Sequence, residues 1–196
     1  MEIKLIFAIL SSLITFVGYS TYVIDIFKKK TEPHLYSWLI WTILPVIGVL
    51  SQFKDGSGYG SWGLIVGCFF CAIIVLSSFK YGTKNITNFD IFCLITSLFA
   101  IFIYLNIQNP IWSIITVSII DVIGFLPTFR KAYVEPLSET PIAFGAMGIS
   151  HLLSLLALQN YTFTTIFYLA VLFFANSTLS AMIFYRKIIT KSGKKV

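Results

Sequence analysis

Long apolar stretches, separated only by short polar connections, are the feature that most constrains how this chain can fold. There are seven of them, and each is long enough to cross a hydrocarbon core of roughly 30 Å as a helix. They cover residues 4–27, 36–53, 61–80, 90–107, 109–128, 141–159 and 163–185. Because they take up most of the 196 residues, we expect no separate soluble domain.

The composition agrees with a membrane location. Hydrophobic residues make up 57% of the chain and charged residues 11%, whereas a soluble domain has roughly 25% charged residues. Backbone groups in lipid must form their hydrogen bonds within the segment, which favours helices. The apolar runs are also continuous and lack the period-two alternation of a membrane barrel. The expected fold class is therefore an all-α integral membrane protein with seven transmembrane helices.

The basic residues predict an orientation. If the seven spans alternate in direction, all but two of the 14 Lys and Arg residues fall on one side, and only Lys4 and Lys54 fall on the other. The first group consists of Lys28, Lys29, Lys30, Lys80, Lys84, Arg130, Lys131, Arg186, Lys187, Lys191, Lys194 and Lys195. Basic loops face the cytoplasm. The N-terminus is then expected outside and the C-terminus in the cytoplasm.

Two segments about a hundred residues apart are alike and indicate an internal repeat. Each has a Gly-aromatic pair late in an apolar span, at Gly18 and Gly124, followed by basic residues and an acidic turn that contains proline. The chain then divides into a first three-helix repeat (1–80), a linker helix (81–108) and a second repeat with a short basic tail (109–196). An odd repeat followed by one linking span makes the two copies parallel.

This 3+1+3 plan resembles the PQ-loop superfamily, which includes the SWEET sugar transporters. The family motif places Pro-Gln near the cytoplasmic end of the first helix of a repeat. Here Pro127-Thr128 stands at that position in the second copy and Ser20-Thr21 in the first. The superfamily also contains retrieval receptors and cofactor transporters. The resemblance therefore implies solute transport, with a non-transporting receptor or scaffold as the alternative.

A second resemblance concerns the segment Lys-Thr-Glu-Pro-His-Leu-Tyr-Ser-Trp at residues 30–38. It is similar to a segment of small bacterial membrane proteins of uncharacterised function. The resemblance implies a divergent bacterial branch of the superfamily and a location in the bacterial cytoplasmic (inner) membrane.

Four residues near the middle of the spans are the predicted substrate-binding residues: Trp41, Asp121, His151 and Asn176. Ionisable groups within a membrane are costly, so Asp121 and His151 are candidates for function. Each could instead form a structural hydrogen bond. Asn176 could join helices, but SWEET transporters place an Asn of the third helix of a repeat against the sugar. The ring of Trp41 could stack on a solute or simply pack.

Three further groups of residues have structural or mechanical interpretations. Pro45 and Pro127 each remove a helix hydrogen bond and are the predicted hinges. Trp38 lies near the end of its span and is interpreted as an interfacial anchor. The cysteine pair 68 and 71 lacks a second pair or a nearby His, and packing is the preferred interpretation.

The leading hypothesis is a transporter of a sugar- or vitamin-like polar solute that works by alternating access at a midplane site between the repeats. The alternative is a non-transporting receptor, assembly factor or scaffold of the same fold. No catalytic motif, cofactor or metal site is expected, because an intramembrane enzyme would need a second acid beside Asp121 and the sequence offers only His151. The expected partners are a small-molecule solute and the lipid bilayer, without nucleic acid, and a homo-oligomer stays open.

Overall fold

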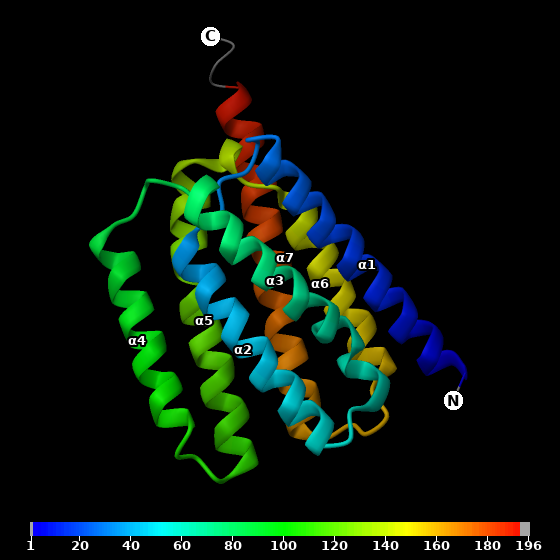
Figure 1. The fold of residues 1–196 in the computed structure, drawn as a ribbon. Helices are drawn as coiled ribbons and strands as arrows, with labels where there is room; N and C mark the ends of the chain where they lie inside the picture. The colour runs from blue at the N-terminus through cyan, green and yellow to red at the C-terminus, as the bar shows by residue number, and fades with distance from the viewer. Residues whose placement is uncertain (1, 193–196) are drawn as a thin grey trace.

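The computed structural model describes residues 2–192, which form seven α-helices and two short 3₁₀ helices and contain no strand (Figure 1). The α-helices are α1 Glu2–Phe27, α2 Leu35–Lys54, α3 Trp62–Tyr81, α4 Asn88–Tyr104, α5 Pro110–Val134, α6 Pro141–Ala157 and α7 Phe163–Ser192. The 3₁₀ helices are η1 Gly58–Ser61 and η2 Pro136–Ser138. The all-helical class and the number of α-helices follow the prediction.

Helix length separates these elements into two groups. Five segments are long enough and apolar enough to cross a membrane: α1, α2, η1 together with α3, α5 and α7. Helices α4 and α6 have 17 residues each, a rise of about 26 Å. They are shorter than the predicted spans 90–107 and 141–159, because α4 ends at Tyr104 and the chain leaves helical geometry after Ala157.

The helices run alternately in opposite directions, so the two termini lie at opposite ends of the bundle (Figure 1). One end, where α1, α3, α5 and α7 finish, is called the basic end. Of the basic residues predicted to share one side, the structure places those from Lys28 to Lys191 at this end. Lys194 and Lys195 lie outside the described residues. Lys4 and Lys54 lie at the opposite end.

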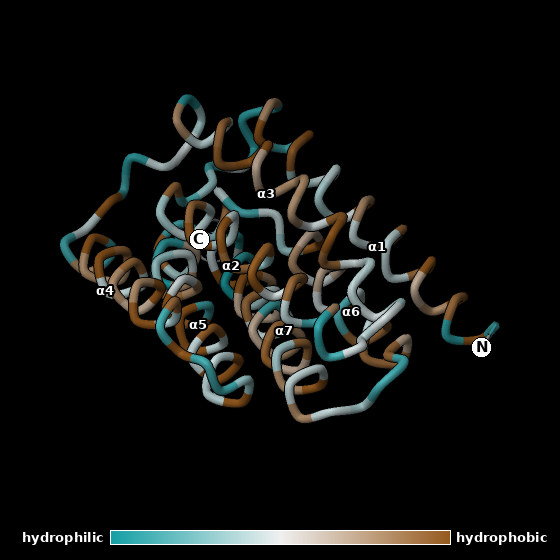
Figure 2. Tube along the Cα trace, turned by 60° about the horizontal axis from the view of Figure 1, so that its bottom comes forward, coloured by the Kyte–Doolittle hydropathy of each residue, from teal (hydrophilic) through white to brown (hydrophobic). Residues whose placement is uncertain are grey.

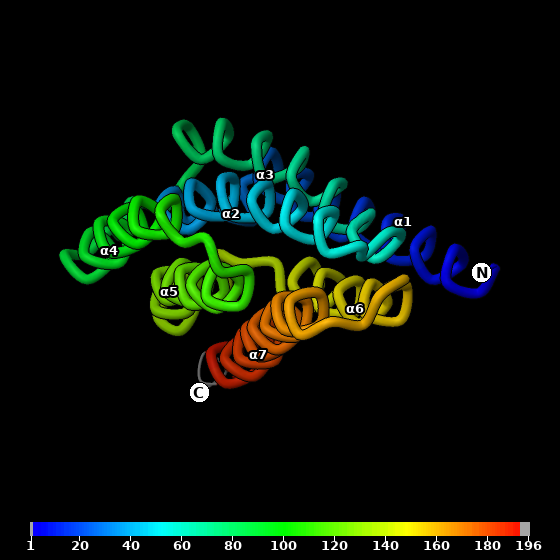
Figure 3. The backbone as a smooth tube through the Cα atoms, turned by 90° about the horizontal axis from the view of Figure 1, so that it is seen from below, coloured from blue at the N-terminus to red at the C-terminus, as the bar shows by residue number. Residues whose placement is uncertain are grey.

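Each of the seven helices packs against at least two others. Helix α3 packs against both α1 and α2, and α7 packs against both α5 and α6. The first three helices meet the last three where α1 packs on α6 and α2 packs on α5, while α4 lies against α5 and, less extensively, α2. Figure 3 shows α1, α2 and α3 in one layer, α5, α6 and α7 in a second, and α4 at the edge.

The surface of this bundle is apolar. Figure 2 shows hydrophobic residues along α4 and on the outer helices, and Phe92, Phe99 and Phe102 of α4 are each more than 60% exposed. Several polar and charged side chains are buried instead, among them Lys131, Glu139 and Asp90. The interior therefore contains polar groups that can build a site.

Candidate functional site

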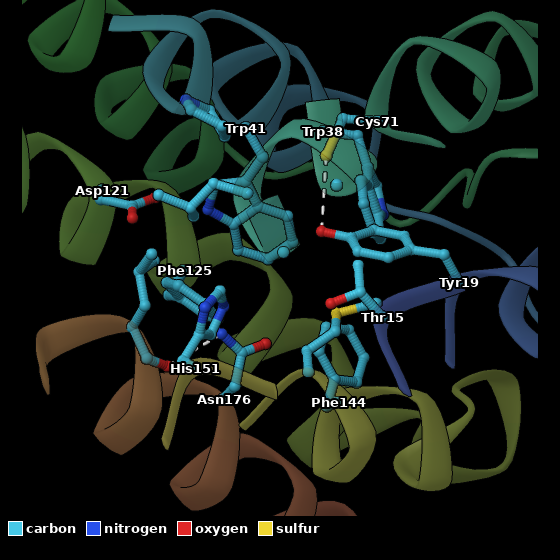
Figure 4. Close-up of a pocket in the computed structure, with 16 residues that line it drawn as sticks. Thr15, Tyr19, Trp38, Trp41, Cys71, Asp121, Phe125, Phe144, His151 and Asn176 are labelled. Atoms are coloured by element: carbon cyan, nitrogen blue, oxygen red, sulfur yellow. Dashed lines mark hydrogen bonds between the residues drawn. The ribbon is translucent and has the colours of Figure 1, made fainter. Parts of the chain in front are cut away.

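A small cavity lies inside the bundle, lined by side chains from six helices (Figure 4). Its volume is about 40 Å³, which is room for about two or three water molecules. Helices α1, α2, α3, α5, α6 and α7 all contribute to its wall, and α4 does not.

All four predicted binding residues line this cavity: Trp41, Asp121, His151 and Asn176. Asp121 is eleven residues from the start of α5 and Asn176 thirteen from the start of α7. These positions are about 17 and 20 Å along their helices. The structure therefore brings these side chains together from four helices, and their role in binding remains a prediction.

The two predicted hinge residues are placed differently. Pro45 lines the cavity from within α2, whereas Pro127 lies in α5 and is buried outside the cavity wall. Both helices continue past their proline, since each proline is assigned inside an unbroken helix.

Ten lining residues form five pairs with a constant separation of 106 residues along the chain. The pairs are Thr15 with Asp121, Tyr19 with Phe125, Trp38 with Phe144, Trp41 with Met147, and Pro45 with His151. The first member of each pair comes from α1 or α2, and the second from α5 or α6. Residues 106 positions apart thus contribute to the same cavity wall.

The twin glycines obey the same spacing. A Cβ atom on Gly18 would lie 2.8 Å from Cβ of Ala146, where α1 meets α6. A Cβ atom on Gly124 would lie 2.9 Å from Cγ2 of Ile40, where α5 meets α2. Ala146 and Ile40 are again 106 residues apart. Glycine is needed at both positions because the helices approach too closely for a side chain.

Aromatic rings form one wall of the cavity. The ring centroids of Trp38 and Trp41 are 5.1 Å apart at an interplanar angle of 89°. Trp41 also packs against Phe125, at 4.4 Å, and against Phe144, at 6.4 Å. These distances fall in or near the range preferred by aromatic pairs. The rings hold one another in place and leave part of their surface facing the cavity.

Both halves of the chain supply polar groups to the cavity wall, and its one carboxylate comes from the second half. Asp121 is only 1% exposed, and neither of its carboxylate oxygens has a hydrogen-bond partner among the described residues. The indole N–H of Trp41 and the hydroxyl of Tyr168, which lies outside the cavity wall, are neutral donors that approach this carboxylate and have no other partner among the described residues. Buried polar groups are nearly always paired in folded proteins. This cluster therefore retains an unused capacity for hydrogen bonds and charge.

His151 and Asn176 lie near each other in the close-up view (Figure 4). The Nδ2 atom of Asn176 donates to the carbonyl of Leu172 at 2.9 Å, one turn earlier in α7. Nδ1 of His151 is buried without a hydrogen bond. On the α1 side, the Thr15 hydroxyl bonds to Ser150 and is already partly used.

A buried ion pair closes the basic end of the bundle. The Nζ atom of Lys131 donates to Oε1 of Glu139 at 2.9 Å and to the carbonyls of Glu32 and Ser138 at 2.6 and 2.8 Å. Both side chains are fully buried. Oε2 of Glu139 accepts a hydrogen bond from Tyr22 at 3.0 Å. The network joins α1 and the loop after it to α5 and the loop after that.

Trp38 extends this network toward the cavity. It is 1% exposed, and its indole N–H donates to the Tyr22 hydroxyl at 3.3 Å. The interpretation of Trp38 as an interfacial anchor is therefore wrong, because the ring lies in the core and lines the cavity. A position near a helix end did not reveal that Tyr19 and Tyr22 of α1 pack against this ring.

A second ionic contact joins α4 to α5. Arg130 binds Asp90 through two hydrogen bonds, Nε to Oδ1 at 2.9 Å and Nη2 to Oδ2 at 2.7 Å. Arg130 also donates to the Asn85 side chain and carbonyl. The backbone N–H and the hydroxyl of Thr87 donate to the same Asp90 carboxylate, at 2.7 and 2.9 Å, and this contact fixes the start of α4.

His34 lies beside this ionic contact. Its Nε2 atom is 3.5 Å from Oδ2 of Asp90, and neither ring nitrogen forms a hydrogen bond within the described residues. Burial lowers the pKa of His34 from 6.5 to about 4, and the charges of Arg130 and Lys131 act in the same direction against the opposing effect of Asp90. The imidazole is therefore neutral near pH 7.

Hydrogen bonds between uncharged groups join the chain at the end of the bundle opposite the basic end. The backbone N–H of Gln159 donates to the Ser57 carbonyl at 3.0 Å, and Nε2 of Gln52 donates to the Thr165 carbonyl at 3.1 Å. These contacts again join the first half to the second. The two halves of the chain are thus joined at both ends of the bundle, by ionic contacts at the basic end and by neutral hydrogen bonds at the other.

Neither a metal-binding cluster among the described residues nor a similar known protein helps to assign the site. Within residues 2–192, no group of three or more His, Cys, Asp or Glu residues is placed to hold a metal ion. No protein-family model, no characterised protein and no solved structure matches the chain.

Proposed function

We propose that the chain is an integral membrane protein of two parallel three-helix repeats joined by α4, and that it transports a small polar solute by alternating access through the central cavity. Paired lining positions of the two halves, at a constant spacing of 106 residues, are the observation that carries this proposal. Repeats related in this way place a binding site at their interface, and rocking of one repeat against the other exposes it to each side in turn.

The membrane part of the proposal is supported by the apolar surface and by the distribution of charge. Large apolar side chains face outward, including those of α4. An apolar exterior of this extent is typical of contact with lipid. The clustering of basic residues at one end favours the basic end as the cytoplasmic end, with the N-terminus outside.

The closure of both ends supports an occluded state, in which the solute site opens to neither side. For opening toward the basic end, the contacts of Lys131 and Glu139 with the first half would have to break. For opening toward the opposite end, the bonds of Gln159 and Gln52 would have to break. The PQ-loop and SWEET-like assignment is part of the same proposal and depends on the 3+1+3 plan.

Uptake into proteoliposomes tests the proposed function. Purified protein is first screened for thermal stabilisation by sugars, vitamins, amino acids and amines, since a ligand of the folded state raises its melting temperature. A stabilising compound is then offered to proteoliposomes as a labelled solute. We expect saturable uptake that falls at least about tenfold in Asp121→Asn and Asn176→Ala, which lose interactions with the solute.

Asp55→Asn is the matched control, because Asp55 lies in the turn after α2 and does not line the cavity. It should transport like the wild type. Unchanged uptake by the Asp121 and Asn176 variants would remove the site assignment. Binding without any uptake would favour the receptor or scaffold alternative.

A further inference from the structure

The central cavity combines one acidic group with an aromatic wall and contains no basic residue. Asp121 is the only acid among the described residues that line it, and neither Lys nor Arg belongs to that set. Both carboxylate oxygens are buried, and the donors that approach them, the indole N–H of Trp41 and the hydroxyl of Tyr168, are neutral. A buried carboxylate without a charged partner is costly, and a positive charge placed beside it removes much of that cost.

The aromatic wall favours the same kind of charge. Trp38 and Trp41 stand nearly perpendicular, with Phe125 and Phe144 next to Trp41. The face of an aromatic ring carries negative potential and attracts a cation within about 6 Å of its centre. Several rings around one carboxylate are the arrangement that recognises alkylammonium groups.

Other solute classes fit the lining less well. A sugar would need many hydrogen-bonding groups, but one hydrogen of the Asn176 amide already binds the Leu172 carbonyl, and the Thr15 hydroxyl binds Ser150. A carboxylate or phosphate solute would meet the Asp121 charge and the negative faces of the rings. The described lining contains neither Lys nor Arg to neutralise an anion, and apart from His151 its hydrogen-bond donors are uncharged.

We infer that the solute of the central cavity is a monovalent organic cation with an alkylammonium head group, which pairs with Asp121 and packs against Trp38, Trp41 and Phe125 once the cavity has widened from its volume of about 40 Å³ in this closed state. This inference rests on the proposed function only in taking the cavity as the binding site. The thioether of Met147 and the thiol of Cys71 complete a lining that is polarizable and apolar. His151 and Asn176 can then bind a hydroxyl group on the solute.

Binding to the purified, full-length protein tests this inference by tryptophan fluorescence. The variant Trp62→Phe/Trp112→Phe removes the two partly exposed tryptophans and leaves only Trp38 and Trp41 as reporters. The probes are tetramethylammonium, choline, its neutral isostere 3,3-dimethyl-1-butanol, and glucose. We expect saturable changes with the two cations, and affinity at least about tenfold weaker for the neutral isostere.

Two variants separate charge from fit. Asp121→Asn should weaken choline at least about tenfold and leave the isostere nearly unchanged, because only the charged partner is lost. Phe125→Leu keeps an apolar side chain but removes one ring. It should weaken choline about threefold to tenfold relative to the isostere, so the inference can still be tested if Asp121→Asn fails to fold. Asp55→Asn is expected to bind choline like its parent.

Each remaining outcome overturns a specific statement. Equal affinity for choline and its isostere, or no saturable change with either cation, overturns the inference. Saturable binding and uptake of glucose without cation binding overturns the inference but leaves the proposed transport intact. Choline binding without uptake into proteoliposomes supports the cation site and overturns transport.

Discussion

Removing the buried charge of Lys131 should destabilise the fold strongly. In Lys131→Met, the Glu139 carboxylate stays buried and keeps only the hydrogen bond from Tyr22. The carbonyl of Glu32 also loses the lysine donor that lies 2.6 Å away. Breaking a buried pair by removing one partner costs about 3–5 kcal/mol. We expect a loss of that size in the free energy of unfolding, measured by denaturant titration in detergent micelles.

The unpaired charge of Glu139 should account for much of the stability lost in Lys131→Met. In Lys131→Met/Glu139→Gln no unpaired charge remains, and the amide can still accept the hydrogen bond from Tyr22. The double variant should therefore recover about 1–3 kcal/mol relative to the sum of the single changes, a coupling typical of residues in direct contact. Lys28→Met is the control, because Lys28 is exposed at the same end and forms no side-chain hydrogen bond or ion pair within the described residues.

If Lys131→Met unfolds no more easily than Lys28→Met, the buried pair does not hold the basic end together. If the two changes at positions 131 and 139 are simply additive, the residues are not energetically coupled. Either result would refute the reasoning.

Three further predictions concern other parts of the same framework. The free energy of unfolding should fall as the pH drops from 6.5 toward 4, because His34 has a lowered pKa of about 4 in the folded protein and takes up a proton on unfolding. In denaturant titrations, the difference in this free energy between wild type and His34→Gln should shrink over that pH range. A difference that is constant with pH would contradict this. Arg130→Lys should lower the free energy of unfolding by about 1–3 kcal/mol, because lysine cannot form both hydrogen bonds to Asp90. A loss of unfolding free energy no larger than that of Arg186→Lys would show that the two hydrogen bonds to Asp90 are unimportant. Gly63→Ala should destabilise by about 1–3 kcal/mol, because its Cβ would lie 2.4 Å from the Ser11 hydroxyl, whereas Gly67→Ala, one turn later with its nearest contact at 3.5 Å, should not; equal thermal stabilities would contradict this.

Much of the fold could be predicted because helices in an apolar environment reveal themselves by hydropathy alone. The predicted spans 4–27 and 36–53 nearly coincide with α1 and α2. The spans 109–128 and 163–185 end well before Val134 and Ser192, where α5 and α7 finish. Hydropathy reports where charged residues begin, but a helix continues as long as its backbone hydrogen bonds do.

The polar residues of the cavity could be predicted from their position in the middle of the spans, whereas the buried ion pair at the basic end could not. Asp121, His151 and Asn176 were recognised because they are polar in the middle of apolar stretches. Lys131 and Glu139 stand in a connection rich in polar residues and resemble ordinary loop charges. Their burial depends on the loop after α1 packing over them through Glu32, a contact between residues 99 positions apart.

The twin glycines, Gly18 and Gly124, already give the spacing of 106 residues in the sequence, but the residue types do not reveal which other pairs line one cavity. Only a few positions of the two halves are chemically alike: Thr15 pairs with Asp121, and Pro45 pairs with His151. The equivalence shows in position and not in residue type. The two halves supply different chemistry to one cavity, with two of the aromatic rings from α2 and the ionisable groups from α5 and α6.

The most direct test of alternating access uses a cysteine that is already in the cavity. Cys71 lines the site and is 1% exposed, so it can react with a polar reagent only when the cavity opens. In a Cys68→Ser/Cys93→Ser background, a membrane-impermeant methanethiosulfonate reagent is added to one side of proteoliposomes with uniformly oriented protein, and then to the other. Alternating access predicts that Cys71 is modified from both sides, and more slowly when a cavity ligand is bound. Modification from one side only, or from neither, would contradict it.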